Sequence, residues 1–174
     1  MPVLSDLEPR EVFAWFERLC AIPHGSHHAK AISDYLVAFA RERGLACRQD
    51  AANNVVIRKA ASAGYENAPV VMLQGHIDMD GDFIRAKGTT LGGDDGIAVA
   101  MALAVLDADD IPHGPLECVF TADEEVGMIG ARALDASDLK AKYLINIDSE
   151  EEGVLTVSCA GACRTLCTLP VTRV

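Results

Sequence analysis

The chain has 174 residues, half of them apolar, which is typical of a folded domain with a hydrophobic core and not of a disordered segment. Its formal net charge of -11 argues against nucleic acid or an anionic membrane surface as a partner. The first ten residues lack the basic and apolar regions of a secretory signal, and no apolar run is long enough to span a bilayer. We therefore expect a cytoplasmic protein whose six cysteines are reduced.

The N-terminal part of the chain predicts two amphipathic helices. Apolar residues recur at helical spacing from Pro9 to Cys20, and Pro23 follows as a stop. A second helix is expected from Ser26 to Arg43, with Gly44 placed to end it. Two strand-like segments then follow, at residues 46–49 and 54–58.

Beyond residue 69, apolar runs and helical patterns alternate, which indicates an α/β domain. The apolar runs are short and continuous, so they predict buried strands, at residues 70–73, 116–121 and 143–147. Helices are expected at residues 94–107 and 127–134. Residues 154–174 have a β-like composition, and we expect a strand there with an exposed, aggregation-prone edge. Three cysteines in this segment, at four-residue spacing, match no common metal motif and are interpreted as small apolar residues.

Acidic or imidazole side chains follow each of these buried strands or open a helix. Taken singly, each group would be interpreted as a solvated polar end or a turn. Together they predict a site, because α/β enzymes build their sites where the carboxyl ends of strands meet. The residues are, in chain order, His76, Asp78, Asp94, Glu124, Glu125 and Asp148.

Imidazole nitrogen and carboxylate oxygen are ligands of catalytic zinc, and two zinc ions can share an activated water. Asp94 follows two glycines at a helix N-terminus, which suits a carboxylate that bridges two ions. His76 and Asp78 point the same way on an extended strand end, so the Asp78 carboxylate can orient the imidazole. Glu124 and Glu125 are adjacent and point in different directions, which suits one metal ligand and one proton acceptor.

These groups resemble the motifs of the M20-type metallopeptidases, and most closely those of the aminoacyl-histidine dipeptidases. The resemblance covers nearly the whole chain and lies in residues 73–79, 87–97, 113–117, 121–128 and 145–153. It implies an α/β fold, namely a zinc-peptidase-like catalytic domain with a mixed, largely parallel central sheet flanked by helices and incomplete at its C-terminus. Residues 1–153 would form the N-terminal part of the catalytic domain, and residues 154–174 would begin a lid and dimerisation domain.

The resemblance also implies a site with two zinc ions, with cobalt or manganese as alternatives. His76 and Asp148 would bind the first ion, Asp94 would bridge both ions, and Glu125 would bind the second. The peptide bond between Asp94 and Asp95 is expected to be cis, as in the family.

By the same resemblance, the catalytic residues would be Asp78, which orients His76, and Glu124, the general base. The implied reaction is hydrolysis of dipeptides of the Xaa-His type, such as β-alanyl-histidine, by a metal-activated water. Family members of full length are homodimers, and no nucleic acid or membrane partner is implied.

The sequence departs from the family in two places. The segment between Asp78 and Asp94 is shorter than in family members, and the chain ends before the region that supplies the last histidine ligand of the second zinc. Two alternatives therefore stay open. One is a truncated, inactive homologue that acts as a metal-binding or structural fragment, and the other is an M20-type aminoacylase or tripeptidase. The remaining histidines are interpreted as surface or loop residues and not as ligands: His24, His27, His28 and His113.

Overall fold

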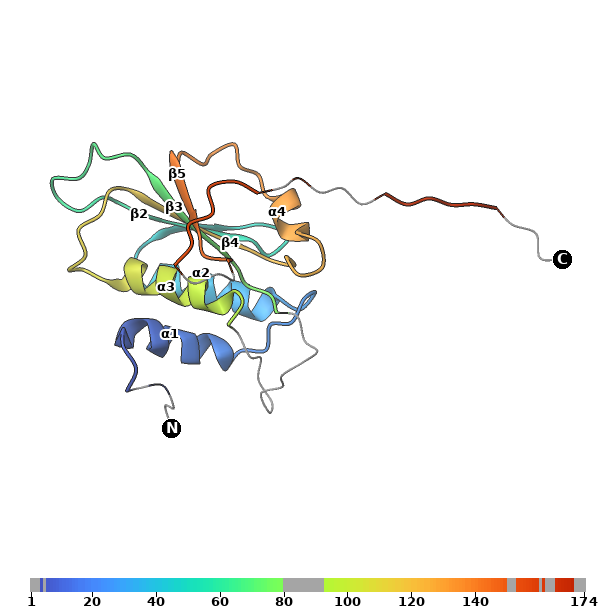
Figure 1. Ribbon diagram of the computed structural model, residues 1–174. Coiled ribbons are helices and arrows are strands. Elements are labelled where there is room, and N and C mark those ends of the chain that lie inside the picture. The colour runs from blue at the N-terminus through green and yellow to red at the C-terminus, as the bar shows by residue number, and fades with distance from the viewer. Residues whose placement is uncertain are drawn as a thin grey trace.

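The computed structural model describes residue 4 and residues 6–79, 93–149, 153–159, 161 and 165–170 (Figure 1). In these parts of the chain, helices and strands alternate much as predicted. The helices are α1 (Arg10–Cys20), α2 (Lys30–Glu42), α3 (Gly96–Asp107) and α4 (Ile129–Ala133). The strands are β1 (Ala46–Gln49), β2 (Val55–Lys59), β3 (Val71–His76), β4 (Leu116–Thr121) and β5 (Tyr143–Asn146).

The two N-terminal helices bury aromatic residues against each other. The Trp15 ring of α1 meets the Phe39 ring of α2 edge-on, with 5.0 Å between ring centroids, and the Arg43 guanidinium lies over both rings. Helix α2 begins at Lys30, four residues later than predicted, because residues 24–28 form a loop whose Gly25 pairs with Met79 after β3.

The five strands form one mixed sheet in the order β1-β2-β4-β3-β5. Strand β2 pairs antiparallel with β1 and β4, whereas β3 pairs parallel with β4 and β5. The α/β class and the mixed sheet are therefore confirmed, with parallel and antiparallel pairings in equal number among the described strands. Because β3, β4 and β5 run in the same direction, their carboxyl ends meet at one edge of the sheet.

Helices α1, α2 and α3 cover one face of the sheet (Figure 1). The main core lies between these helices and strands β2 and β4, where Leu103 of α3 and Phe120 of β4 are fully buried. A smaller cluster covers the other face, where Val56, Met72 and Val119 pack against residues of the segment 134–141. Among the described residues, no helix combines the length and apolarity that a bilayer crossing requires.

Strand β5 corrects the prediction of a buried strand at residues 143–147. Its side chains are exposed, with Tyr143, Leu144 and Ile145 at 54%, 59% and 49%, because β5 lies at the edge of the described sheet and pairs there only with β3. A largely apolar cavity of about 720 Å³ lies beside it, lined by residues of α1, β3, α3 and β5, such as Met101 and Ile145. Helix α3, which lines this cavity, carries apolar residues on every side.

The predicted strand within residues 154–174 is also wrong for the residues that the structure describes. Residues 154–159 and 165–170 form no strand, and Leu155 and Val157 are 92% and 96% exposed. A β-like composition does not suffice, because a strand needs a neighbour that accepts its backbone hydrogen bonds, and none of the described strands lies beside this segment. The shortened segment after Asp78 lies at residues 80–92, outside the described residues.

Two leucine substitutions test this division between core and exposed edge. We expect Leu103→Ala to lower the free energy of unfolding by about 2–5 kcal/mol, because it leaves a cavity in the core. The matched control Leu144→Ala, on β5, should change it by no more than about 0.5 kcal/mol. Urea denaturation measures both, and equal effects would contradict the exposed placement of β5.

Candidate metal centre

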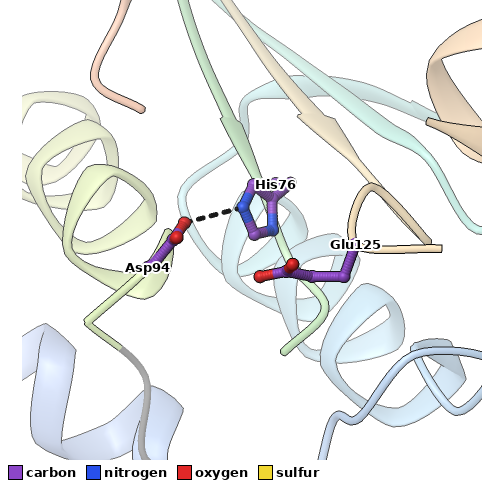
Figure 2. A group of neighbouring side chains, drawn as sticks. All are labelled: His76, Asp94 and Glu125. Atoms are coloured by element: carbon purple, nitrogen blue, oxygen red, sulfur yellow. Dashed lines mark hydrogen bonds and ion pairs between the residues drawn. The ribbon is translucent and has the colours of Figure 1, made fainter. Parts of the chain in front are cut away.

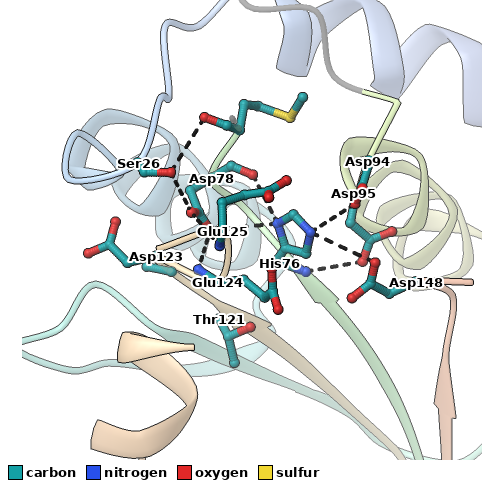
Figure 3. A network of polar contacts seen from close by, with 12 residues as sticks. Ser26, His76, Asp78, Asp94, Asp95, Thr121, Asp123, Glu124, Glu125 and Asp148 are labelled. Atoms are coloured by element: carbon teal, nitrogen blue, oxygen red, sulfur yellow. Dashed lines mark hydrogen bonds and ion pairs between the residues drawn. The ribbon is translucent and has the colours of Figure 1, made fainter. Parts of the chain in front are cut away.

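The structure brings all six predicted site residues together at the carboxyl edge of β3, β4 and β5 (Figure 3). His76 ends β3, and Asp78 follows it. Glu124 and Glu125 lie on the turn after β4, and Asp148 lies two residues after β5. Asp94 precedes α3 and reaches the cluster from the side (Figure 3). The six residues thus come from the ends of four elements, and the sheet register sets the relative positions of those that follow β3, β4 and β5.

Hydrogen bonds fix the orientation of the His76 imidazole. Its Nδ1 lies 2.9 Å from the backbone carbonyl oxygen of Asp78, which can only accept a hydrogen bond. Nδ1 therefore carries the proton, and in the neutral ring Nε2 is left with a lone pair. This Nε2 lies 2.9 Å from Asp94 Oδ1 and 4.0 Å from Asp148 Oδ1. The ring presents to the carboxylates the nitrogen that can bind a metal.

The predicted contact between the Asp78 carboxylate and His76 needs correction. Asp78 Oδ1 lies 3.6 Å from His76 Nδ1, too far for a hydrogen bond, and the carbonyl of Asp78 takes that role instead. The carboxylate is turned toward the loop after β4, where it accepts from the backbone N–H groups of Glu124 at 2.8 Å and Glu125 at 3.3 Å. The Asp78 carbonyl thus accepts the hydrogen bond from the imidazole, and the Asp78 carboxylate faces the same ring nitrogen as an ion pair.

Asp78 is fully buried and yet ionised. Burial alone would raise the pKa of its carboxyl group. The nearby His76 ring and the hydrogen bonds donated by the Glu124 backbone N–H and the Ser26 hydroxyl outweigh burial and hold that pKa below its ordinary value. The buried charge is thus compensated mainly by donors from three different segments of the chain.

Asp95 belongs to the site and was missed in the sequence. The Asp94–Asp95 peptide bond is cis, as predicted, and the Asp95 side chain is buried, with Oδ2 accepting from the backbone N–H of His76 at 3.1 Å. A Cβ atom on Gly75 would lie 2.8 Å from this oxygen, so the close contact requires glycine there. The glycine before His76 was the available sequence signal.

Two groups of side chains could each hold a metal ion. One consists of His76, Asp94 and Glu125 (Figure 2), and the other of His76, Asp95 and Asp148. Within each group the ligand atoms lie within 4.8 Å of one another. One imidazole with two carboxylates and room for further ligands matches the donor set of a catalytic zinc site, so the residues fit the predicted metal. Both groups use the same histidine, so its Nε2 can serve only one of them at a time.

The other histidines take no part in these two groups. Among the residues that the structure describes, His76 is the only histidine in either group, and neither contains a cysteine. His24 lies in a loop, as one of the two predicted settings, and is buried there with Nδ1 against the carbonyl oxygen of Ile22. His113 lies before β4, at the end of the sheet opposite His76, as predicted.

Burial and neighbouring charges shift the pKa values of three side chains in the cluster. Burial by itself would lower the pKa of His76, but Asp78, Asp95 and Asp94 outweigh it and raise the pKa to about 10. Burial raises the pKa of Asp95 to about 7. Burial also raises the pKa of Glu124, and the nearby carboxylates of Asp148, Asp78 and Asp94 act in the same direction. Without a metal, the cluster therefore holds protons that a cation would displace.

Comparison with known proteins shows which proteins the chain resembles. No protein-family model matches it. The cytosol non-specific dipeptidase of Escherichia coli is 42% identical over 182 residues, which covers 92% of this chain. The crystal structure of aminoacylhistidine dipeptidase from Vibrio alginolyticus superposes with a TM-score of 0.78 at 40% identity over 86% of this chain. The chain is a homologue of these M20-family dipeptidases.

This dipeptidase homologue spans 38% of the length of the Escherichia coli protein and 35% of that of the Vibrio alginolyticus chain. The fold also occurs in more distantly similar proteins. The YXEP protein of Bacillus subtilis, described as a dinuclear metal binding peptidase of the M20 family, shares 18% identity. It has a TM-score of 0.55 over 81% of this chain and 43% of its own, which shows a common fold only.

The raised pKa of His76 predicts that zinc binding depends on pH. Zinc requires the neutral imidazole, whereas the metal-free ring is protonated up to about pH 10. We therefore expect zinc affinity to rise roughly tenfold per pH unit between about pH 6 and pH 8, as protons compete less. Titration against a competing chelator at each pH measures this.

Two histidine variants serve as controls for the pH experiment. His76→Asn should lose zinc binding, whereas His113→Asn, at the other end of the sheet, should keep both the affinity and its pH dependence. An affinity that does not change with pH would contradict the assignment of the displaced proton to His76.

Proposed function

We propose that the chain carries the metal-binding part of a dipeptidase site and that this site hydrolyses dipeptides of the Xaa-His type, such as β-alanyl-histidine. The most direct support is the convergence of His76, Asp94 and Glu125 at one edge of the sheet. The chain is also a homologue of dipeptidases. In this proposal, residues 1–153 belong to the catalytic domain and residues 154–174 begin a second, lid and dimerisation domain. A cytoplasmic location and a homodimer of the full-length protein belong to the same proposal.

The proposal divides the zinc ligands as the family resemblance implies, whereas both groups of neighbouring side chains in the structure include His76. His76 and Asp148 would bind one ion, Asp94 would bridge to a second, and Glu125 would bind that second ion, with cobalt or manganese as alternatives. A bound ion would polarise the substrate carbonyl and lower the pKa of a water in the site. A cavity of about 210 Å³ beside Asp94, Asp95 and Asp148 offers space next to these ligands.

Glu124 is the proposed general base. Burial raises the pKa of Glu124 toward neutral pH, and a base with a pKa nearer the working pH both accepts and returns a proton efficiently. A carboxylate oxygen of Glu124 would take the proton from the attacking water. It would then give this proton to the amine nitrogen as the carbon–nitrogen bond breaks. Asp78 fixes the backbone N–H of Glu124 at 2.8 Å and so holds the base in place.

The alternative is a homologue that binds metal without turnover. It is favoured by one observation, namely that neither metal-binding group of the described residues contains a second histidine. A site with few ligands would hold zinc but position the second ion poorly. The tripeptidase and aminoacylase alternatives differ only in substrate, so the same assay with a tripeptide and with an N-acyl amino acid tests them.

Hydrolysis of β-alanyl-histidine by the zinc-loaded chain tests the proposal. We expect Glu124→Gln to reduce the rate by about 100-fold or more, because the amide cannot accept the proton, while zinc affinity is kept. Glu42→Gln is a matched control, since Glu42 is exposed on α2 and its loss should not alter the rate.

Each other outcome has a distinct meaning. Zinc binding without turnover in the parent chain would support the alternative of a metal-binding homologue. A chain that binds no zinc would refute both functions, and equal rates in the parent chain and Glu124→Gln would exclude Glu124 as the base.

A further inference from the structure

The loop between α1 and α2 lies against the candidate site, although it is distant from it in sequence. Gly25 forms a bridge with Met79, the backbone N–H of Ser26 donates to the Met79 carbonyl at 3.3 Å, and both contacts lie just after β3. The loop therefore lies alongside the segment that carries His76 and Asp78.

Ser26 is placed in sequence to cap a helix but does not do so. A serine shortly before a helix commonly accepts from the first backbone N–H groups, yet α2 starts at Lys30 without any side-chain cap. The Ser26 hydroxyl instead donates to Asp78 Oδ2 at 2.9 Å, across 52 positions of the chain (Figure 3). The hydroxyl contacts a buried charge at the site and not its own helix.

The Asp78 carboxylate connects Ser26 to both glutamates. Oδ1 accepts from the backbone N–H of Glu124 at 2.8 Å, and Oδ2, which accepts from Ser26, also accepts from that of Glu125 at 3.3 Å. The hydroxyl gives the third hydrogen bond to a carboxylate whose two oxygens also accept from two consecutive backbone amides. Loss of the hydroxyl would remove one of these three restraints and would weaken the hold on both amides.

A second contact joins the same two loops. The backbone N–H of His27 donates to Asp123 Oδ1 at 2.6 Å, and Asp123 directly precedes the glutamates. His27 and Asp123 both have positive φ, at 66° and 55°, so the two turns are tightly bent where they meet. The α1–α2 loop thus contacts the turn after β4 directly at Asp123 and indirectly, through Asp78, at Glu124 and Glu125.

We propose that Ser26 is a positioning residue of the candidate site, which acts through Asp78 on the turn that carries Glu124 and Glu125. The contacts hold whatever reaction the site performs, whereas the consequence for a metal rests on the proposed function. Ser26 itself touches neither a metal-binding group nor a proton acceptor of the reaction in this arrangement.

Amide hydrogen exchange of the metal-free chain tests the positioning role directly. We expect Ser26→Ala to accelerate exchange at the Glu124 and Glu125 amides by about tenfold, because their acceptor loses one of its three restraints. Ser26→Thr keeps the hydroxyl and should restore slow exchange. The amides of Val119 and Phe120 in β4 report on general loss of stability and should not change.

Ser33→Ala is a matched control for this experiment. Ser33 is buried and donates to the Asn53 carbonyl at 2.8 Å, away from the site, so its loss should leave the Glu124 and Glu125 amides unaffected. Unchanged exchange at these amides in Ser26→Ala, or equal acceleration throughout β4, would overturn the proposal.

A double-mutant cycle on zinc affinity tests whether Ser26 acts through Glu125. We expect Ser26→Ala to weaken zinc binding by roughly threefold to tenfold, and to have no further effect when Glu125→Ala is already present. Additive losses would overturn the route through Glu125. A parent chain that binds no zinc would refute the proposed function, and the exchange experiment would still decide the role of Ser26.

Discussion

The parallel pairing of β3 with both β4 and β5 is the constraint on which the candidate site depends. His76 lies opposite Thr121 in one pairing, and Gln74 lies opposite Asn146 in the other. The ligands follow these positions by a few residues, so their separation is set by backbone hydrogen bonds of the sheet. A slip of one residue would turn each side chain to the opposite face and would dissolve the cluster. The buried carboxylate of Asp95 adds to this constraint, since it binds the backbone N–H of His76 directly.

Negative charge at this edge is balanced in two different ways. Asp78 is surrounded by hydrogen-bond donors and stays ionised in the interior, which makes it a structural charge. His76 and Asp95 have pKa values raised to about 10 and about 7, so this part of the cluster holds protons near neutral pH when no cation is present. The first arrangement is rigid and does not require a metal. The second is exchangeable, because a divalent ion can replace the protons. The structural charge of Asp78 and the metal-binding nitrogen of His76 thus lie only two residues apart along the backbone.

The presence of the strands and the six polar residues near the ends of strands or helices could be predicted from the sequence, because periodicity and local polarity are enough to indicate them. The positions of β1 and β4 were predicted to the residue. What could not be predicted depends on contacts between distant segments. The Ser26–Asp78 hydrogen bond spans 52 positions, and the Asp95–His76 hydrogen bond spans 19. Likewise, the apolar residues of β5 indicate a strand but do not indicate what covers it. The β-like composition of residues 154–159 indicates a preference for strand structure, but no described strand lies beside them to pair with.

The open apolar face along β5 and α3 affects how the folded chain would respond to common stability probes. Environment-sensitive dyes such as ANS fluoresce on exposed apolar surface, and their binding is ordinarily taken as a sign of a molten globule. Here the cavity of about 720 Å³ and the exposed Leu144 and Ile145 offer such surface in the native fold. A high dye signal at low temperature would therefore be compatible with a well-packed core around Leu103 and Phe120. Near-ultraviolet circular dichroism of Trp15, whose ring is fixed against Phe39, would distinguish the native state from a collapsed one.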